Sequence, residues 1–256
     1  MENQSLSHLK IEDFDKSKYK EYKKNVWICK DLDIDRPVYH YLRLERLFSL
    51  LETSILYFAN RQSFADLREQ GKKEDLKYYF SCFQDAKEDK KNVMERTIIH
   101  NQRKKSAETC TAISCWTWDS HYNGKDESYI LWAWFGEKRY RIQSTIRAII
   151  DNLEPSDCEI IINNVEYKKE TFESTVNAQV FRKDIRYADE QEVRFCVLNC
   201  PQSISIPIID ISRFIHKVRP SPFMSKMING LVRDKLTKQF VWLKDKFEST
   251  TILEKT

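Results

Sequence analysis

Glycine is scarce in this sequence, which has only 4 glycines among 256 residues. A loop that cradles phosphates needs several glycines close together, and neither the Walker pattern nor the dinucleotide-binding pattern occurs. Long apolar runs are missing too, since none approaches the roughly 20 residues that span a bilayer. The sequence therefore excludes these nucleotide-binding loops and predicts no membrane partner.

Paired cysteines are also absent, because none of the 7 cysteines forms a Cys-x-x-Cys pair. Their number is odd and no signal peptide precedes them, which favours free thiols in a reducing cytoplasm. Cys196, Cys200 and His216 do not have the spacing of a standard zinc site, so we predict no metal.

The composition that is present is typical of a folded protein. Hydrophobic residues make up 41% and charged residues 32%, and aromatic residues reach 12%, which argues against disorder. The net charge of +4 is too small to indicate a nucleic-acid partner by itself.

Hydrophobic periodicity predicts one mixed α+β domain over residues 1–256. Residues 1–36 are expected to form a polar N-terminal extension with a short helix near Phe14–Lys24, and residues 71–105 a charged helical insertion. The segment Val165–Tyr167 is expected to pair in a hairpin with the strand before it. Strands are predicted at 38–42, 55–58, 110–118, 139–143, 158–162, 190–198, 204–208 and 214–218, and helices at 43–52, 127–135, 146–152 and 223–238.

The stretch 187–198 joins an acidic cluster to a strand pattern. Side chains alternate along an extended chain, so Glu190, Glu192 and Arg194 would share one face, with the two carboxylates roughly 7 Å apart. The intervening residues Val193, Phe195 and Val197 would enter a core. Such charges are costly to bury unpaired, so they should line a wet cleft or the surface. The alternative is an edge strand protected by charge.

Several short motifs follow one another in a recognisable order. They are Val38-Tyr39-His40-Tyr41, Leu56-Tyr57-Phe58, Ser63-Phe64-Ala65-Asp66, Ser114-Cys115-Trp116, Glu127-Ser128 with Leu131-Trp132, Ile142-Gln143-Ser144-Thr145, and Lys183 with Tyr187, Glu190, Glu192 and Arg194. This order resembles the bacterial family called domain of unknown function 2971, over residues 37 to about 253. That family in turn resembles the ADP-ribosyltransferase superfamily in fold and motifs.

The resemblance implies a mixed, mostly antiparallel split sheet and a reaction with NAD as substrate. It implies ADP-ribosyl transfer or NAD hydrolysis, in a bacterial toxin or a phage-defence effector, with a protein or nucleic acid as acceptor. Breaking the bond between ribose and nicotinamide passes through an oxocarbenium-like transition state, which a carboxylate stabilises. Glu192 is the expected catalytic carboxylate, and Glu190 would steer or deprotonate the acceptor.

The remaining motif residues would hold NAD in this interpretation. His40 would bond the second ribose, and Ser144 and Thr145 would shape the nicotinamide pocket. Arg194 and Lys183 would meet the diphosphate, while Tyr187 and Trp132 would stack on a ring of NAD. All of them except Tyr187 also have an ordinary structural interpretation. These are a sheet histidine for His40, helix caps for Ser144 and Thr145, ion pairing with the acidic cluster for Arg194 and Lys183, and core packing for Trp132.

The second hypothesis is a binding module without turnover, for nucleic acid or protein. The C-terminal part of the sequence is basic and contains interleaved aromatic residues. Its cations are Lys217, Arg219, Lys226, Arg233, Lys235, Lys238, Lys244 and Lys246, and its aromatic residues are Phe223, Phe240 and Trp242. A solvated helix face is the alternative, because Asp234, Asp245 and Glu248 dilute the charge.

Overall fold

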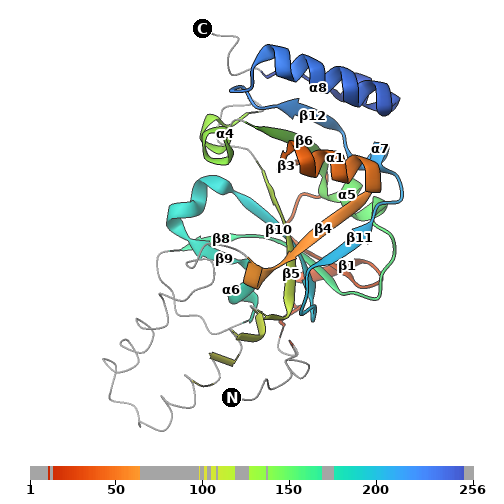
Figure 1. Ribbon diagram of the computed structural model, residues 1–256. Helices are drawn as coiled ribbons and strands as arrows, with labels where there is room; N and C mark the ends of the chain where they lie inside the picture. Colours follow the sequence, from red (N-terminus) through yellow and green to blue (C-terminus); the bar gives the residue numbers. More distant parts are fainter. Residues whose placement is uncertain are drawn as a thin grey trace, which may run out of the picture.

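The computed structural model describes residues 14–63, 109–118, 127–136, 138–168 and 176–250, together with Ile11 and six positions between 98 and 107. Within this part of the chain a ten-stranded sheet forms the centre of the molecule (Figure 1). Its main path runs in the order β1-β2-β7-β10-β5-β3-β6-β12, while β4 pairs with β5 and β11 pairs with β4. A separate pair, β8 and β9, forms a small second sheet.

The elements alternate irregularly along the chain. The strands are β1 (Tyr19–Lys23), β2 (Val26–Cys29), β3 (Pro37–Arg43), β4 (Ile55–Asn60), β5 (Thr111–Thr117), β6 (Arg139–Thr145), β7 (Ile160–Asn164), β8 (Glu166–Lys168), β9 (Arg182–Asp184), β10 (Glu192–Leu198), β11 (Ile204–Pro207) and β12 (Lys217–Pro220). The helices are α1 (Leu44–Thr53), α4 (Tyr129–Phe135), α5 (Ile146–Asn152), α6 (Val176–Phe181), α7 (Ile211–Phe214) and α8 (Lys226–Gln239), with 3-10 turns η2 (Arg61–Ser63), η3 (Ile185–Glu190) and η4 (Val241–Lys246).

Strand pairing is mixed and mostly antiparallel, which confirms the α+β prediction. Among the described strands of the large sheet, the β2–β7 pair is the parallel one. The other described pairs run antiparallel, including the central β7-β10-β5 group. This arrangement places β10 in the middle of the sheet, where all seven of its residues are buried.

The two faces of the sheet differ in chemistry. Residues opposite one another in paired strands share a face, so the strand register assigns the side chains. We call one side the apolar face, which includes Val38, Trp116, Ile142, Val193 and Phe195. We call the other side the polar face, which includes Tyr39, Thr117, Arg141, Glu192 and Arg194.

Different helices cover these faces. The buried leucines of α1 and the buried isoleucines of α5 belong to the main apolar core together with the apolar face. Leu131 and Trp132 of α4 instead form a second small cluster with Tyr39 and Tyr41 of the polar face. Burial of a large apolar side chain stabilises the folded chain by about 1.5–3 kcal/mol, so these contacts hold α4 against β3.

The N-terminal segment departs from its prediction. Tyr19–Lys23, where a helix was expected, is strand β1, and it pairs with β2, which lies beside β7. Two parts of the segment 1–36, β1 and β2 (Val26–Cys29), therefore belong to the sheet. Tyr19 is buried, whereas Lys20 and Glu21 face solvent. The burial of Tyr19 and the hydrogen bonds to β2 therefore stabilise a strand here, although the composition of the segment is polar.

Other predictions have mixed outcomes. The expected hairpin of Val165–Tyr167 is wrong, because β8 pairs in parallel with β9. The segment 214–218 begins as the end of α7 and becomes strand only at Lys217. The 71–105 insertion lies almost entirely outside the described residues. No helix in the described ranges has the length and apolar character needed to cross a bilayer.

Candidate functional site

Glu192 opens β10, and the alternation expected from the sequence holds along this strand. Glu192 and Arg194 point to the polar face, whereas Val193 and Phe195 enter the apolar core. Glu190 is different, because it ends the 3-10 turn η3, and Gln191 follows it with a φ of 42°. The prediction that both glutamates lie on one extended strand is therefore wrong. The left-handed residue between them interrupts the extended conformation before the strand begins.

Lys183 nevertheless joins the two carboxylates. Its Nζ lies 2.6 Å from Oε2 of Glu190 and 3.1 Å from Oε2 of Glu192. Arg194 completes the cluster, with Nε and Nη2 donating to the two carboxylate oxygens of Glu192 at 3.0 and 3.1 Å. The third nitrogen of Arg194, Nη1, donates to the carbonyl of Val180 in α6 at 2.6 Å. We call these four side chains the β10 ion cluster.

Burial and charge act in opposite directions on Glu192. Burial is the largest influence and tends to raise the pKa of this carboxyl, but Arg194 and Lys183 outweigh it and lower the pKa to about 2. The thiol of Cys115 also donates to the carboxylate, and burial beside Glu192 raises the pKa of that thiol well above its usual value. Glu192 is thus a carboxylate that is ionised at neutral pH and enclosed by donors. Glu190, whose side chain is 20% exposed, is the more accessible carboxylate.

His40 lies on the other side of the sheet. Tyr39 pairs with Thr117, and Thr117 pairs with Glu192, so these three residues share the polar face and His40 points the opposite way. Its ring packs edge-on against Trp116, with centroids 5.1 Å apart. Burial, together with the charge of Arg139, lowers the pKa of His40 to about 4. The expectation that His40 and Glu192 share one pocket is therefore not met.

Three more of the predicted ligand residues have structural roles. Ser144 is fully buried and donates to the carbonyl of Phe214 at 2.6 Å. Thr145 caps α5 by accepting from the backbone N–H of Ala148 at 3.1 Å. Trp132 is fully buried, and its indole N–H donates to Glu127 at 3.3 Å. These three residues do not meet the β10 ion cluster, whereas Tyr187 does, because the ammonium of Lys183 lies 5.2 Å above its ring.

The outer side of α4 is aromatic and exposed. The sequence pattern predicted a buried helix over 127–135, but Tyr129 is 55% exposed and Trp134 is 51% exposed. The rings of Trp134 and Tyr187 lie nearly parallel, with centroids 6.3 Å apart and an angle of 26°. We call Tyr129, Ile130, Trp134 and Tyr187 the α4 aromatic surface.

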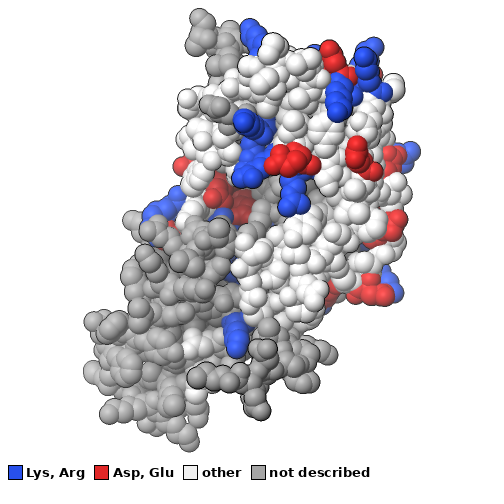
Figure 2. All heavy atoms as spheres, viewed as in Figure 1, with Lys and Arg blue, Asp and Glu red and all other residues white. Residues whose placement is uncertain are grey.

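Two arginines lie beside the end of α4. Arg43 of β3 and Arg139 of β6 are opposite one another in the register. Arg139 also packs against the ring of Phe135 at 5.8 Å and donates to the Phe135 carbonyl at 3.0 Å. Burial and the positive charge of Arg43 lower the pKa of Arg139, while the nearby carboxylate of Glu45 acts in the opposite direction. Basic side chains lie beside α4 and the start of β6 in the space-filling view, with an acidic group next to them (Figure 2). Two like charges held together in this way attract anions, and Glu45 is an acidic group of the same chain that acts on Arg139.

The C-terminal basic segment gives a different result. Lys217 and Arg219 pair with Glu248, at 2.7 and 2.5 Å. Lys246 donates to the carbonyls of Ser212 and Ile215 at the end of α7. Several of the cations that suggested a nucleic-acid contact are thus bound to a carboxylate or to backbone carbonyls of the same chain.

Sequence reasoning missed the α4 aromatic surface and the contacts of Glu127. A signal for the surface was present in the run Tyr-Ile-Leu-Trp-Ala-Trp-Phe at 129–135. A helix of two turns can bury only one stripe, so apolar residues around its whole circumference must leave some exposed. Glu127 had no comparable signal, because its partners Arg219 and Thr250 lie far along the chain.

The fold and this face define an α+β protein whose mixed sheet carries a charged cluster and an exposed aromatic helix on one side. Comparison with protein-family models, with curated proteins and with solved structures finds no match. In the described part of the chain, no group of three or more His, Cys, Asp or Glu side chains is placed to hold a metal ion.

Proposed function

We propose that this chain binds single-stranded nucleic acid on the α4 aromatic surface, without turnover. The observation that carries the proposal is the half-exposed indole of Trp134, which is stacked nearly parallel on Tyr187 and lies in a helix whose last residue, Phe135, contacts Arg139. Exposed aromatic faces with basic neighbours are the arrangement by which proteins hold unpaired bases and their phosphates.

Stacking supplies the base contact in this proposal. An exposed indole accepts any base on its face, and each such contact contributes about 1–3 kcal/mol. Tyr187 supports the indole from behind and is itself covered by the ammonium of Lys183. Ile130 lies one turn before Trp134 on the same side of α4 and extends the apolar platform.

Charge supplies the phosphate contact. Arg43 and Arg139 are held side by side by the β3–β6 register, so their two positive charges would attract a phosphate in addition to Glu45. Lys138 is exposed on the same segment and adds a third cation. Contacts of this kind release counterions, so binding should weaken as salt rises.

The test is fluorescence anisotropy with a labelled oligodeoxythymidylate, comparing the unaltered protein with Trp134→Ala. Loss of one stacking contact is expected to weaken binding by about 5-fold to 100-fold. Tyr57→Ala is the matched control, because Tyr57 is also an exposed aromatic residue with an arginine, Arg46, above its ring. Equal affinity of the Trp134 variant and the unaltered protein, or binding that ignores salt, would overturn the proposal.

ADP-ribosyl transfer from NAD is the second candidate, and the β10 ion cluster is the observation that favours it. Lys183, Glu190, Glu192 and Arg194 lie together, and Tyr187 adjoins them. Glu190 is the better candidate for contact with substrate, because Glu192 is enclosed by its two cations and Cys115. The second candidate ranks below the first because His40 and Ser144 lie on the opposite face and lend this cluster no ligand.

Nicotinamide release from NAD separates the two candidates. Transfer or hydrolysis requires release by the unaltered protein and its loss in Glu190→Gln. Glu166→Gln is the control, because Glu166 is an exposed carboxylate that also pairs with basic residues. A protein that releases no nicotinamide yet binds oligonucleotide supports the first candidate alone.

A further inference from the structure

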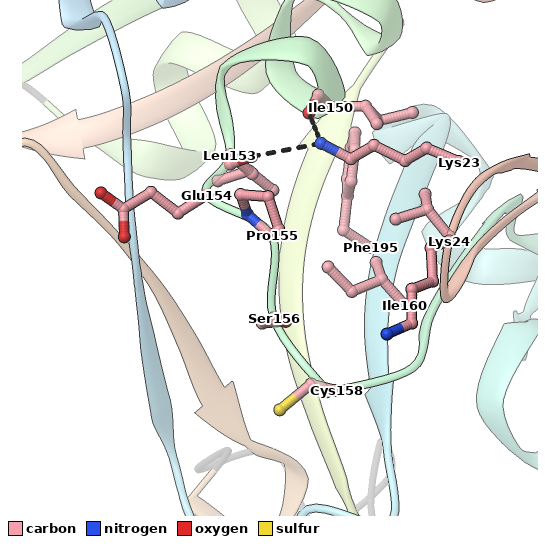
Figure 3. A pocket seen from close by; sticks show the side chains of 11 residues that line it. Lys23, Lys24, Ile150, Leu153, Glu154, Pro155, Ser156, Cys158, Ile160 and Phe195 are labelled. Carbon is pink, nitrogen blue, oxygen red and sulfur yellow. Dashed lines mark hydrogen bonds between the residues drawn. The ribbon is translucent and has the colours of Figure 1, made fainter.

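A cavity lies on the apolar face, between the β1–β2 turn and the segment that joins α5 to β7 (Figure 3). Its volume is about 200 Å³. The floor is formed by buried apolar side chains, among them Val26, Leu153, Ile160 and Phe195. Its rim includes the exposed residues Lys24, Glu154 and Pro155, so the cavity opens from the core to solvent.

The size of this cavity limits its occupant. A dry apolar cavity of about 150 Å³ accommodates a benzene ring, so this one has room for a ring and one small polar group. Drug-sized ligands need about 300 Å³ or more, so a nucleotide does not fit. The cavity is separate from the β10 ion cluster, because Phe195 and Ile160 lie on the apolar face of the sheet and the cluster lies on the polar face.

Two lysines line the cavity. The ammonium of Lys23 donates to the carbonyls of Ile150 and Leu153, at 2.5 and 3.1 Å, which caps the end of α5. An ammonium has three N–H groups, so one remains after these two bonds. Figure 3 shows the side chain of Lys24 beside Ile160, while the carboxylate of Glu154 points away from the other lining residues. Lys24 therefore supplies a positive charge at the rim, whereas the ammonium of Lys23 lies at the carbonyls that end α5 and is influenced by Asp151.

We propose that this cavity binds a small monocyclic aromatic or short aliphatic carboxylate, with the hydrocarbon part on Phe195 and Ile160 and the carboxylate at Lys24 on the rim. The apolar floor favours the hydrocarbon, and charge-assisted hydrogen bonds favour the anion. The proposed ligand of this cavity does not depend on the α4 aromatic surface, so each of the two proposals can be tested without the other.

Benzoate is the test probe, titrated into the whole chain with methyl-labelled isoleucine, leucine and valine for NMR. Saturable shifts are expected at the methyls of Val26, Ile150, Leu153 and Ile160, with a dissociation constant of about 1 mM. Neutral benzyl alcohol should bind more weakly. Ser156→Phe, which adds bulk at the half-buried rim, should abolish the shifts.

Lys24→Gln tests the role of charge, since Lys24 is exposed and its replacement leaves the core intact. It should weaken benzoate binding by about 3-fold to 10-fold and leave benzyl alcohol unchanged. Lys20→Gln is the matched control, because it removes the same charge from the same hairpin at a residue that does not line the cavity. Absence of saturable shifts up to about 10 mM, equal affinity for the alcohol, or an equal effect of the two lysine variants would overturn the proposal.

Discussion

The environment of Glu192 indicates a structural role for this carboxylate. Its side chain is 5% exposed and is bound by Arg194 and Lys183, whose own side chains are nearly as buried. Removing one partner from such a buried group leaves uncompensated charge, at a cost of about 3–5 kcal/mol. We therefore infer that the main role of Glu192 is to stabilise the fold.

Glu192→Gln is expected to lower the free energy of unfolding by about 3–5 kcal/mol at neutral pH. The effect should depend on pH, because the pKa of this carboxyl is about 2 in the folded chain and near 4.5 when unfolded. A lowered folded-state pKa stabilises above pH 4.5, and this stabilisation is lost as pH falls towards 2. The difference between the two proteins in urea denaturation should shrink over that interval.

Glu166→Gln provides the comparison for this measurement, because Glu166 is about half exposed and its ion pairs are solvated. That change should alter stability by about 0–1 kcal/mol. A Glu192 variant as stable as the Glu166 variant would show that the β10 ion cluster contributes little.

His40 illustrates why part of the site could not be predicted from sequence. Alternation within β10 correctly separated Glu192 and Arg194 from Val193 and Phe195, since it depends on one strand alone. The relative facing of His40 and Glu192 depends on the register of β3 against β5 and of β5 against β10. No local pattern determines those registers, and a shift of one residue would exchange the faces.

At the scale of elements, α4 depends on its cap. Ser128 is buried, and its hydroxyl accepts from the backbone N–H of Leu131 at 3.3 Å. A helix of seven residues has few internal hydrogen bonds, so the loss of this one matters more than it would in a long helix.

Ser128→Ala is expected to destabilise the chain by about 1 kcal/mol and to weaken oligonucleotide binding, because it loosens the helix that carries Trp134. Thr145→Ala removes the equivalent cap of α5 and should cost about the same stability without affecting binding. Denaturation and anisotropy on both variants check this. Equal binding by the two would show that the order of α4 is irrelevant to the ligand.

The elements that the sequence predicted well have strong internal periodicity. The helix beginning at Leu44 and the strand at Pro37–Arg43 were predicted to within a residue or two, because their apolar spacing is regular. β1 was missed because lysines surround its one buried aromatic residue, Tyr19. Its strand conformation comes from pairing with β2, which composition does not reveal.

At the scale of the whole molecule, Arg219 connects parts of the chain that are distant in sequence. It lies in β12, with Nη1 at 3.3 Å from Glu127, just before α4, and Nη2 at 2.5 Å from Glu248 near the C-terminal end of the described chain. Glu127 also accepts from Trp132 and Thr250. The network fastens both α4 and the segment around Thr250 to the sheet.

Arg219→Leu is expected to destabilise the chain by about 3–5 kcal/mol, because Glu127 keeps a buried charge that has lost its cation. Amide hydrogen exchange in α4 should quicken at the same time. Adding Glu127→Gln, which removes the charge and keeps an acceptor for Trp132, should recover part of the loss. Strictly additive effects in the double variant would contradict the coupling.

The central claim is that unpaired bases lie on the α4 aromatic surface, and photo-crosslinking tests it most directly. An oligonucleotide containing 4-thiouridine is irradiated with the whole chain, and the attached peptides are identified by mass spectrometry. Crosslinks to α4 at Tyr129 or Trp134, or to Tyr187 of η3, are the expected result, and they should disappear in Trp134→Ala but persist in Tyr57→Ala. Crosslinks confined to the basic helix α8 and η4, or none at all, would contradict the account.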